Sequence, residues 1–397
     1  MPQCSHRSLL VALAVGLIAG AAFAQSSGSA SPGVTEGNLK RLQEMRDTID
    51  ADSLAPPSRL TPLGYRVDWQ TRVNRSPGSI LVNAFVAADG IYTHDSNNLV
   101  SRVSLDRGEV IWQTPVGAAS DELLDVYRVA TSEHNQVMVV GRLAVHLIDF
   151  QSGVYDTRER VTPTLYTPAA IRGPYLIYGS RGGQITWHQW EVGYPWRGNS
   201  LPGAVTAEPL VVGDMVFAVG STGRILALDA NSTRLRWEKQ LVTGIDARPA
   251  YADELLLVAG RDQYLWALDA RDGSTVWRYF TESQLVTPPT VVGDAVYQWV
   301  PTEGLVKCVL RPQDRIDGQV LWRQPEATGA IIATHQNRLL LWDPFARVLK
   351  AVDIITGTVI DSISLPRVRS ITADGFDGTA LNFLSEDGTV MRAVAQN

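Results

Sequence analysis

The sequence GRILALDANSTRLRW at residues 223–237 returns 40 residues later as QYLWALDARDGSTVW at 263–277. Looser copies of the same unit start at residues 98, 143, 183, 304 and 347. The position four residues after the turn glycine or threonine recurs every 39–45 residues, from Trp69 to Asp361. A fixed period of this length is typical of repeat architectures, in which each repeat is one supersecondary unit.

Each unit contains four short strands separated by tight turns. In the copy at 207–241, apolar runs alternate with turns at 213–214, 221–223 and 229–233. Glycine, aspartate, asparagine and serine are the residues that such turns favour. Four strands of about five residues, with their turns, fill about 40 residues. We therefore expect one four-stranded antiparallel sheet in each repeat.

The strands are apolar almost without alternation, as in Leu255-Leu256-Leu257-Val258. A sheet with one face in solvent would alternate apolar and polar residues, whereas a sheet covered on both faces need not. Four-stranded sheets stacked radially, each covered by its neighbours, form a β-propeller. A linear solenoid would also cover both faces, but it needs capping repeats, and no repeat of this sequence has the pattern of a cap.

The two ends of the repeat region complement each other. The last repeat, which ends in LSEDGTVMRAVAQN at 384–397, has three strands, and the first element, at 65–73, is a lone fourth strand carrying Trp69. Joining them forms an eighth blade and removes two exposed strand edges. The sequence therefore predicts an all-β fold over 63–397. We expect an eight-bladed β-propeller of four-stranded antiparallel blades, with the ring closed by the N- and C-terminal strands.

Residues 1–24 have the pattern of a secretory signal peptide. Arg7 precedes the apolar stretch at 9–24, and Ala22-Phe23-Ala24 is a small-x-small cleavage site before Gln25. An uncleaved membrane anchor is the alternative, but this stretch is shorter than the roughly 20 apolar residues that a membrane span needs. We expect cleavage, no membrane span in the mature chain, and a periplasmic or otherwise exported protein.

Residues 25–62 form the predicted linker, which begins with the low-complexity stretch QSSGSASPGVT. A short amphipathic helix is predicted within it, at 36–50, because four apolar residues fall on one helical face. These residues are Leu39, Leu42, Met45 and Ile49. The helix could dock on the propeller, bind a partner or serve as a spacer.

The repeated pattern x-Leu-x-Ala-Leu-Asp-Ala-x-x-Gly-x-x-x-Trp resembles the tryptophan-docking repeat of the quinoprotein, or PQQ-like, propellers. The resemblance covers 65–397 and is strongest at 223–237 and 263–277. That family contains PQQ-dependent dehydrogenases and also non-enzymatic relatives such as the outer-membrane assembly factor BamB, an eight-bladed lipoprotein. WD-repeat propellers are the rival, but the lone Trp-Asp pair, Trp342-Asp343, falls in a predicted second strand.

Each repeated residue has a structural reason. The glycine, found at 108, 153, 273, 318 and 357, permits a positive φ in a tight turn. The aspartate, found at 229, 269 and 353, can accept hydrogen bonds from backbone N–H groups of the same turn. The tryptophan fills the widening gap between neighbouring blades, and its buried N–H needs a carbonyl. Because these residues recur, we interpret them as framework rather than as an active site.

We predict no catalytic, cofactor-binding or metal site, and hence no cofactor. In a quinoprotein enzyme the resemblance implies PQQ, Ca²⁺, an aspartate base and, in the alcohol dehydrogenases, adjacent cysteines. This chain has two separate cysteines, Cys4 and Cys308, and lacks long inserted loops. Its six histidines form no metal-type i, i+4 pair. The net charge of −6, without a long basic run, also argues against nucleic acid as a partner.

One repeat departs from the pattern with aromatic residues. Where other blades read Ala-Leu-Asp, this one reads Trp187-His188-Gln189-Trp190, followed by Tyr194 and Trp196. Interface cores favour tryptophan and tyrosine, so non-repeating aromatics on a repeat scaffold are candidates for specific contacts. Local repacking around a shifted Trp196 is the alternative. We take Trp187, Trp190, Tyr194 and Trp196 as candidate protein-binding residues.

The predicted function is that of a non-enzymatic, exported protein-binding scaffold, and the resemblance implies a role in outer-membrane or envelope protein assembly. Expected partners are envelope or outer-membrane proteins, with this chain a monomer within a complex. A PQQ-dependent quinoprotein oxidoreductase is the alternative function. BamB carries a lipobox cysteine after the apolar core of its signal. Here Cys4 precedes that core and Gln25 follows the cleavage site, so no lipid anchor is expected.

Overall fold

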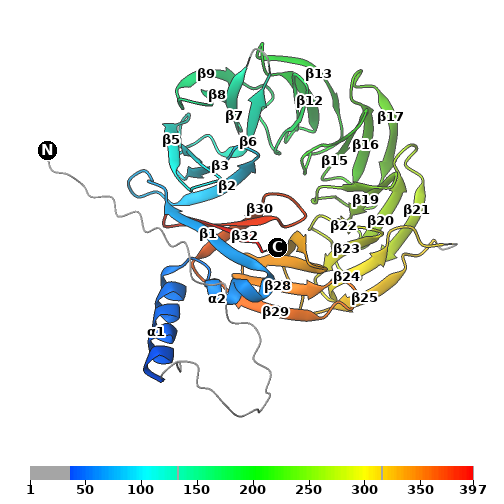
Figure 1. Cartoon of the computed structure of the whole chain (residues 1–397). Coiled ribbons are helices and arrows are strands. Elements are labelled where there is room, and N and C mark those ends of the chain that lie inside the picture. The colour runs from blue at the N-terminus through cyan, green and yellow to red at the C-terminus, as the bar shows by residue number, and fades with distance from the viewer. Residues whose placement is uncertain (1–35, 132–133, 314–315, 397) are drawn as a thin grey trace. The chain divides into compact units, whose positions relative to one another are not determined.

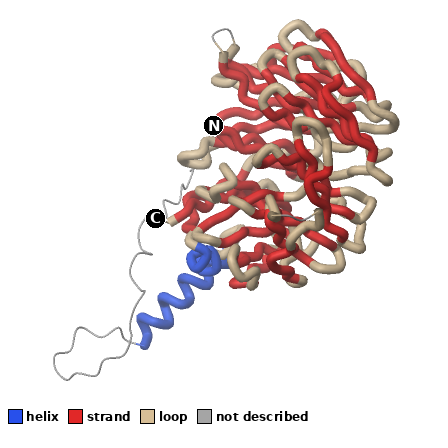
Figure 2. Tube along the Cα trace, turned by 90° about the vertical axis from the view of Figure 1, so that its right-hand side faces the viewer, coloured by secondary structure: helices blue, strands red, loops and turns tan. Residues whose placement is uncertain are grey.

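The structure, a computed structural model, describes residues 36–131, 134–313 and 316–396. The predicted signal peptide at 1–24 and the first part of the predicted linker lie outside these ranges. The chain divides into two compact units, Met1–Arg46 and Asp47–Asn397. The second unit holds eight four-stranded antiparallel sheets arranged in a ring (Figure 1), as the repeat period predicts. Strands make up most of this unit (Figure 2).

We number the blades along the chain and give their strands in order. Blade 1 consists of β2 (Leu81–Ala87), β3 (Gly90–Asp95), β4 (Leu99–Val103) and β5 (Val110–Pro115). Blade 2 consists of β6 (Leu123–Ala130), β7 (Asn135–Gly141), β8 (Ala144–Asp149) and β9 (Tyr155–Arg160). Blade 3 consists of β10 (Ala170–Arg172), β11 (Tyr175–Gly179), β12 (Gln184–Gln189) and β13 (Tyr194–Ser200). Blade 4 consists of β14 (Leu210–Val212), β15 (Met215–Val219), β16 (Arg224–Asp229) and β17 (Leu235–Gln240).

The second half of the ring follows the same plan. Blade 5 consists of β18 (Ala250–Ala252), β19 (Leu255–Ala259), β20 (Tyr264–Asp269) and β21 (Thr275–Phe280). Blade 6 consists of β22 (Thr290–Val292), β23 (Ala295–Val300), β24 (Gly304–Val309) and β25 (Val320–Gln324). Blade 7 consists of β26 (Ala330–His335), β27 (Arg338–Asp343), β28 (Val348–Asp353) and β29 (Val359–Ser364). Blade 8 consists of β30 (Val368–Ala373), β31 (Ala380–Ser385), β32 (Thr389–Ala395) and β1 (Tyr65–Arg72).

Blade 8 closes the ring by combining the two ends of the repeat region. The strand order in this sheet is β1-β32-β31-β30. Strand β1 pairs antiparallel with β32, so that Trp69 lies opposite Arg392 and Gln70 opposite Met391. The predicted closure by the N- and C-terminal strands is therefore confirmed.

Consecutive blades meet at interfaces that we call seams, and five of the eight seams carry the same tryptophan contact. The fourth-strand tryptophan of one blade donates its indole N–H to a backbone carbonyl in the third turn of the next blade. The bonds are Trp69 to Leu105 at 2.8 Å, Trp112 to Phe150 at 2.9 Å, Trp237 to Ala270 at 2.9 Å, Trp277 to Leu310 at 2.8 Å and Trp322 to Ile354 at 3.3 Å.

The turn glycines lie directly under these indoles. A Cβ at Gly108, where φ is +68°, would come within 2.5 Å of the Trp69 ring. A positive φ was predicted for Gly318 as well, and there the prediction is wrong, because Gly318 does not adopt a left-handed φ. Its missing side chain still serves the seam, since a Cβ would lie 3.1 Å from the ring of Trp277. The recurrent glycine therefore has two roles: it forms the turn, and its lack of a side chain lets the indole ring pack against the backbone.

The seam between blades 7 and 8 has Asp361 where a tryptophan is expected. The space is filled by residues 50–63, which we call the N-terminal strap and which include α2 (Pro57–Leu60) and η1 (Thr61–Leu63). Leu60 and Leu63 are buried in one cluster with Ile363 and other residues of blades 7 and 8. Arg59 pairs with Asp361 at 3.0 Å. The last residues of the segment predicted as a linker therefore pack into the core of the propeller.

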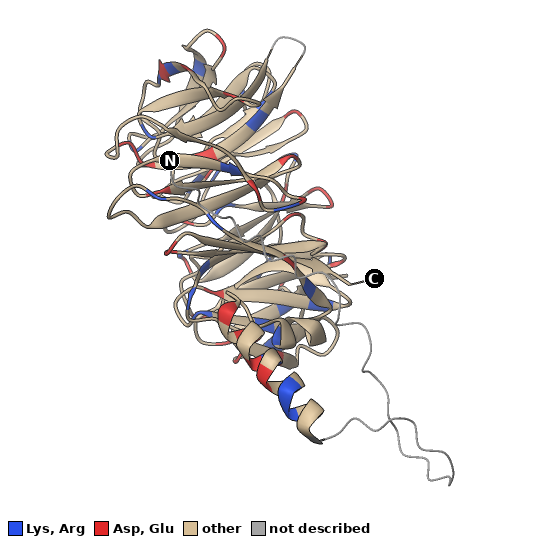
Figure 3. Cartoon of the chain, turned by 60° about the vertical axis from the view of Figure 1, so that its left-hand side comes forward, with Lys and Arg blue, Asp and Glu red and all other residues tan. Residues whose placement is uncertain are grey.

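The predicted helix at 36–50 corresponds to α1 (Glu36–Asp52). Its predicted apolar face is exposed to solvent, with exposed fractions between 44% and 60% for Leu39, Leu42, Met45 and Ile49. Acidic and basic residues both occur along α1 and over the blades in the view of Figure 3. Of the helices in the described residues, none is long and apolar enough to cross a bilayer.

Candidate functional site: the seam between blades 3 and 4

The four predicted contact residues occupy two different kinds of environment in blade 3. Trp187 lies on β12 and is completely buried, and Trp190, just after β12, is 3% exposed. Tyr194 and Trp196 lie on β13, where Tyr194 is 57% exposed and Trp196 is half-buried. Tyr194 and Trp196 are therefore the two members of this set that solvent, or a partner, can reach.

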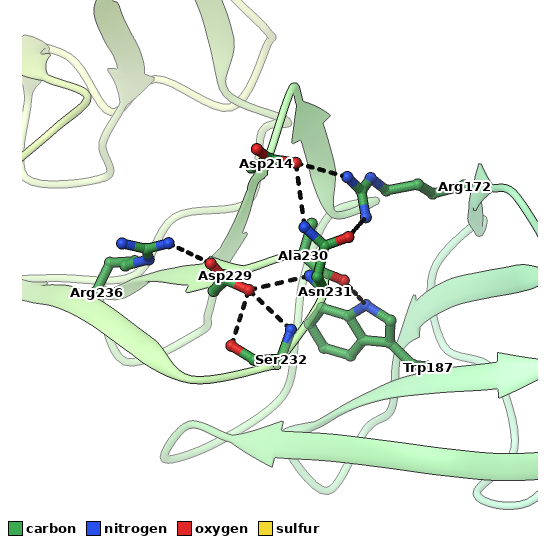
Figure 4. Close-up of polar contacts among 8 residues, drawn as sticks. All are labelled: Arg172, Trp187, Asp214, Asp229, Ala230, Asn231, Ser232 and Arg236. Atoms are coloured by element: carbon green, nitrogen blue, oxygen red, sulfur yellow. Dashed lines mark hydrogen bonds and ion pairs between the residues drawn. The ribbon is translucent and has the colours of Figure 1, made fainter.

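Trp187 makes the docking contact of this seam from the neighbouring strand. Its indole N–H donates to the carbonyl oxygen of Ala230 at 3.0 Å (Figure 4), the same bond that Trp237 makes one blade later. Trp187 lies opposite Arg197 on β13, as Ala227 lies opposite Trp237. The indole has thus moved across the sheet by one strand while keeping its acceptor in the next blade.

The turn that receives this indole has changed as well. Thr233 occupies the position of the recurrent glycine and holds a φ of 62°, a conformation that is strained for a β-branched residue. The neighbouring Asp229 accepts hydrogen bonds from the backbone N–H of Ser232 at 2.8 Å and of Asn231 at 3.1 Å. Arg236 pairs with the same carboxylate (Figure 4), and its guanidinium, together with Ser232, holds the pKa of Asp229 far below its usual range.

Because Trp187 supplies the buried indole, the rim of this seam carries other side chains. Trp196 stacks on Tyr175 with 5.0 Å between ring centroids, and the Arg197 guanidinium lies 4.7 Å from the Trp196 centroid. Arg172 of blade 3 reaches blade 4, where it donates to Asp214 at 2.9 Å (Figure 4). We call Arg172, Tyr175, Trp196, Arg197 and Asp214 the seam surface. It combines aromatic faces with guanidinium groups, the side chains that interface hot spots favour.

Trp190 serves the preceding seam, between blades 2 and 3. The docking position of blade 2 holds Thr157, so no indole reaches blade 3 from that strand. Trp190 occupies the position of Ala230 in the next blade and packs in one cluster with Val145 and Leu147 of blade 2. The large ring therefore fills the space that the absent docking tryptophan would take. In the sequence, the signal for this replacement is that Thr157 stands at a tryptophan position while Trp190 stands at an alanine position of the next repeat.

The sequence motifs did not predict Tyr175, Arg172 and Asp214 as members of this surface. Tyr175 begins β11 at the position that Met215 and Leu255 occupy in the next two blades. An aromatic residue at a position that is otherwise aliphatic could therefore be recognised in the sequence. Arg172 ends β10, just before the first turn of blade 3, and Asp214 lies within the first turn of blade 4. These turns vary among the repeats, so the pairing across the seam follows from the tertiary structure.

A cavity of about 440 Å³ is lined by residues of β30, β2 and β6, the first strands of blades 8, 1 and 2. These strands lie on the inner side of the ring (Figure 1). Its charged side chains are Asp125 and Arg128. Burial raises the pKa of Asp125, which accepts a hydrogen bond from Tyr127 at 2.7 Å. Arg128 is already paired with Asp89 at 2.6 Å. PQQ is a tricarboxylate and needs uncommitted cations, so these residues do not fit it.

Within residues 36–131, 134–313 and 316–396, no three histidine, cysteine or carboxylate side chains gather in a way that could hold a metal ion. Cys308 is a buried free thiol, and burial raises its pKa to about 12. A thiol held neutral in this way is a weak nucleophile.

The sequence of this chain is similar to those of known proteins. A family model described as "Outer membrane protein assembly factor BamB" matches residues 176–328, from blade 3 to the end of blade 6. BamB of Yersinia pestis is 24% identical over 275 residues, which cover 59% of this chain and 66% of that protein. BamB of Moranella endobia is 27% identical over 134 residues, 32% of either chain. The chain thus spans from a third to just under two thirds of these relatives.

A longer and weaker match exists to BamB of Burkholderia pseudomallei, which is 20% identical over 330 residues, 78% of this chain and 73% of that protein. Among solved structures, BamB from Moraxella catarrhalis superposes with a TM-score of 0.63 at 20% identity, covering 82% of this chain and 98% of that one. The designed propeller Ika8 gives a TM-score of 0.64 at 13% identity, over 81% and 98%. At such identities the likeness to solved structures shows the fold alone.

Proposed function

We propose that this chain, a PQQ-like β-propeller of the BamB type, is a non-enzymatic protein-binding component of outer-membrane protein assembly. The observation that carries the proposal is the family match over residues 176–328, which contains Trp196, Arg197 and Asp214 of the seam surface and four docking indoles. Relatives that share these repeats carry the name of an outer-membrane assembly factor.

The predicted location and partners belong to the same proposal. The signal pattern at 1–24 supports export to the periplasm, where envelope and outer-membrane proteins would be available as partners. The chain would act there as one copy within a complex. Its recurrent residues hold blades together through indole-to-carbonyl bonds, which explains their repetition without any catalytic role.

We place the partner contact at the seam surface and the adjoining Tyr194. Trp196 and Tyr175 present stacked rings, and Arg197 caps them with an exposed guanidinium. Trp187 holds the strand beneath them but is buried, so it supports the surface without forming part of it. Rigid aromatic side chains lose little conformational entropy on binding, which favours them as anchors.

Site-specific photocrosslinking tests this proposal. A photoreactive residue is placed at Tyr194 or Trp196 of the full chain, with Leu235 as the matched control, because Leu235 lies on the fourth strand of the next blade and is 47% exposed. We expect crosslinks to outer-membrane assembly proteins from 194 and 196 and few from 235. Equal crosslinking from all three positions would contradict the assigned surface. Dye-linked alcohol oxidation on supply of PQQ and Ca²⁺ would contradict the non-enzymatic role.

A further inference from the structure

The seam between blades 2 and 3 differs from the others in what it buries. Like the seam between blades 7 and 8, it lacks an indole-to-carbonyl bond, because Thr157 replaces the docking tryptophan. It also contains His188, which is completely buried on β12. We propose that this seam is the acid-labile joint of the ring, and that protonation of His188 opens it.

The strand geometry directs His188 into this seam. Side chains alternate between the two faces of a strand. Trp187 points toward blade 4, as its bond to Ala230 shows, so His188 lies on the opposite face, with Tyr178, and looks toward blade 2. The His188 and Tyr178 rings are 6.4 Å apart. Within the described residues, neither ring nitrogen of His188 has a hydrogen-bond partner.

Among the residues that the structure describes, none places a counter-charge beside His188. The blade 2 side chains of this cluster are apolar, namely Val129, Met138, Val140, Val145 and Leu147. In the described part of the seam, the titratable groups are Tyr178, Tyr127, which donates to Asp125, and, toward the rim, Glu159, His134 and Glu191. Burial is the cause that lowers the pKa of His188, without a contribution from a charged neighbour. An imidazolium here would be both desolvated and unpaired.

The other two fully buried histidines each have a polar contact at a ring nitrogen, although Nε2 of His94 also lacks a partner. His146 contacts the Tyr155 hydroxyl at 2.8 Å and the Asp121 carboxylate at 3.5 Å. His94 contacts the Asp95 carbonyl at 3.3 Å. When His146 takes up a proton it gains an ion pair with Asp121, whereas His188 gains no partner. The least costly response at His188 is therefore to admit water by separating blades 2 and 3.

The sign of the effect follows from the direction of the pKa shift. The pKa of His188 is lowered from 6.5 in the closed ring and returns toward 6.5 when the seam opens. The open form therefore binds the proton more tightly, and the closed form loses stability as the pH falls below 6.5. One pH unit below that value, the equilibrium constant for opening rises by up to about tenfold.

Hydrogen–deuterium exchange of the full chain at pH 7.5 and 5.5, corrected for intrinsic rates, tests the proposal. We expect peptides covering β8, β9 and β12 to open up to about tenfold more at pH 5.5. Peptides of β20 and β21 at the seam between blades 5 and 6, which holds Trp277 and contains no histidine, should not change.

Two variants separate His188 from a general effect of acid. In His188→Gln the acid-induced opening should disappear, and in the matched control His146→Gln it should persist. The proposal is overturned if His188→Gln retains the effect or if exchange rises equally at both seams. If His188→Gln does not fold, an NMR titration of His188 in the native chain decides the question. A pKa below 6.5 supports the proposal, and a pKa at or above 6.5 overturns it.

Discussion

Moving the docking indole of blade 3 back to its usual strand is the sharpest test of the seam architecture. In Trp187→Ala a fully buried indole is lost together with its 3.0 Å bond to the Ala230 carbonyl. Truncating a buried aromatic side chain costs about 3–5 kcal/mol, of which about 1 kcal/mol is the hydrogen bond. We expect this loss in the free energy of unfolding, with a similar loss for Trp237→Ala as the matched control.

The rescue copies the arrangement of the other seams. Arg197→Trp places an indole opposite position 187, and Thr233→Gly clears the surface beneath it, since a Cβ at the equivalent Gly273 would lie 2.6 Å from Trp237. Replacing Thr233, with its φ of 62°, also relieves strain on the order of 1 kcal/mol. The triple variant should recover about 2 kcal/mol or more of the loss from Trp187→Ala, on the burial energies of large side chains.

Guanidinium denaturation of the four proteins measures these values. A loss of less than about 1 kcal/mol in Trp187→Ala is too little for a buried aromatic side chain and would contradict the docking role of Trp187. A triple variant no more stable than Trp187→Ala would contradict the equivalence of positions 187 and 197.

Three further predictions concern the strap, acid and the seam surface. Leu60→Ala in the buried strap should lower the free energy of unfolding by about 2–5 kcal/mol in denaturant melts. Arg59→Ala should lower it by less than about 1 kcal/mol, because its ion pair is half exposed. Similar losses for the two variants would argue against a packed strap. The thermal midpoint should fall as the pH is lowered from 7 to 5, because burial lowers the pKa of four histidines and the unfolded chain binds those protons more tightly; a midpoint that rises toward pH 5 would contradict this. These are His94, His146, His188 and His335. Trp196→Ala should abolish the crosslinks from Tyr194 and shift the melting midpoint much less than Trp187→Ala does; an unchanged crosslinking pattern would remove Trp196 from the contact.

Most of the ring could be predicted from local patterns. The 40-residue period, the continuous apolar strands and the complementary ends predict eight blades and their closure, because each of these features can be recognised within short segments of the sequence. The strap could not be predicted in the same way. Its residues lie in a proline-containing stretch whose packing depends on a distant seam, although Asp361 in a tryptophan position marked that seam as unusual.

The candidate site was predicted only in part, for a geometric reason. The four aromatic residues were singled out together because they are close in sequence, but a strand sends alternate residues to opposite faces. Trp187 and Trp190 therefore serve different seams, and both are framework in position. The sequence does contain a signal that the docking tryptophan is at position 187 and not at 197. In most blades the third-strand residue that lies opposite the docking residue precedes it by ten positions, as Ala227 precedes Trp237 and Trp187 precedes Arg197. The contact between Arg172 and Asp214 joins two blades and has no local signal.

Closure of the ring by the two ends of the chain is the central claim, and a disulfide across β1 and β32 tests it most directly. Arg72 and Thr389 lie opposite each other in the register of these strands, so cysteines at the two positions fall within the distance that a disulfide requires. We expect the double variant Arg72→Cys, Thr389→Cys to form an intramolecular disulfide readily on oxidation and to have a higher unfolding midpoint. Failure of the folded double variant to form that bond would show that the two ends do not pair.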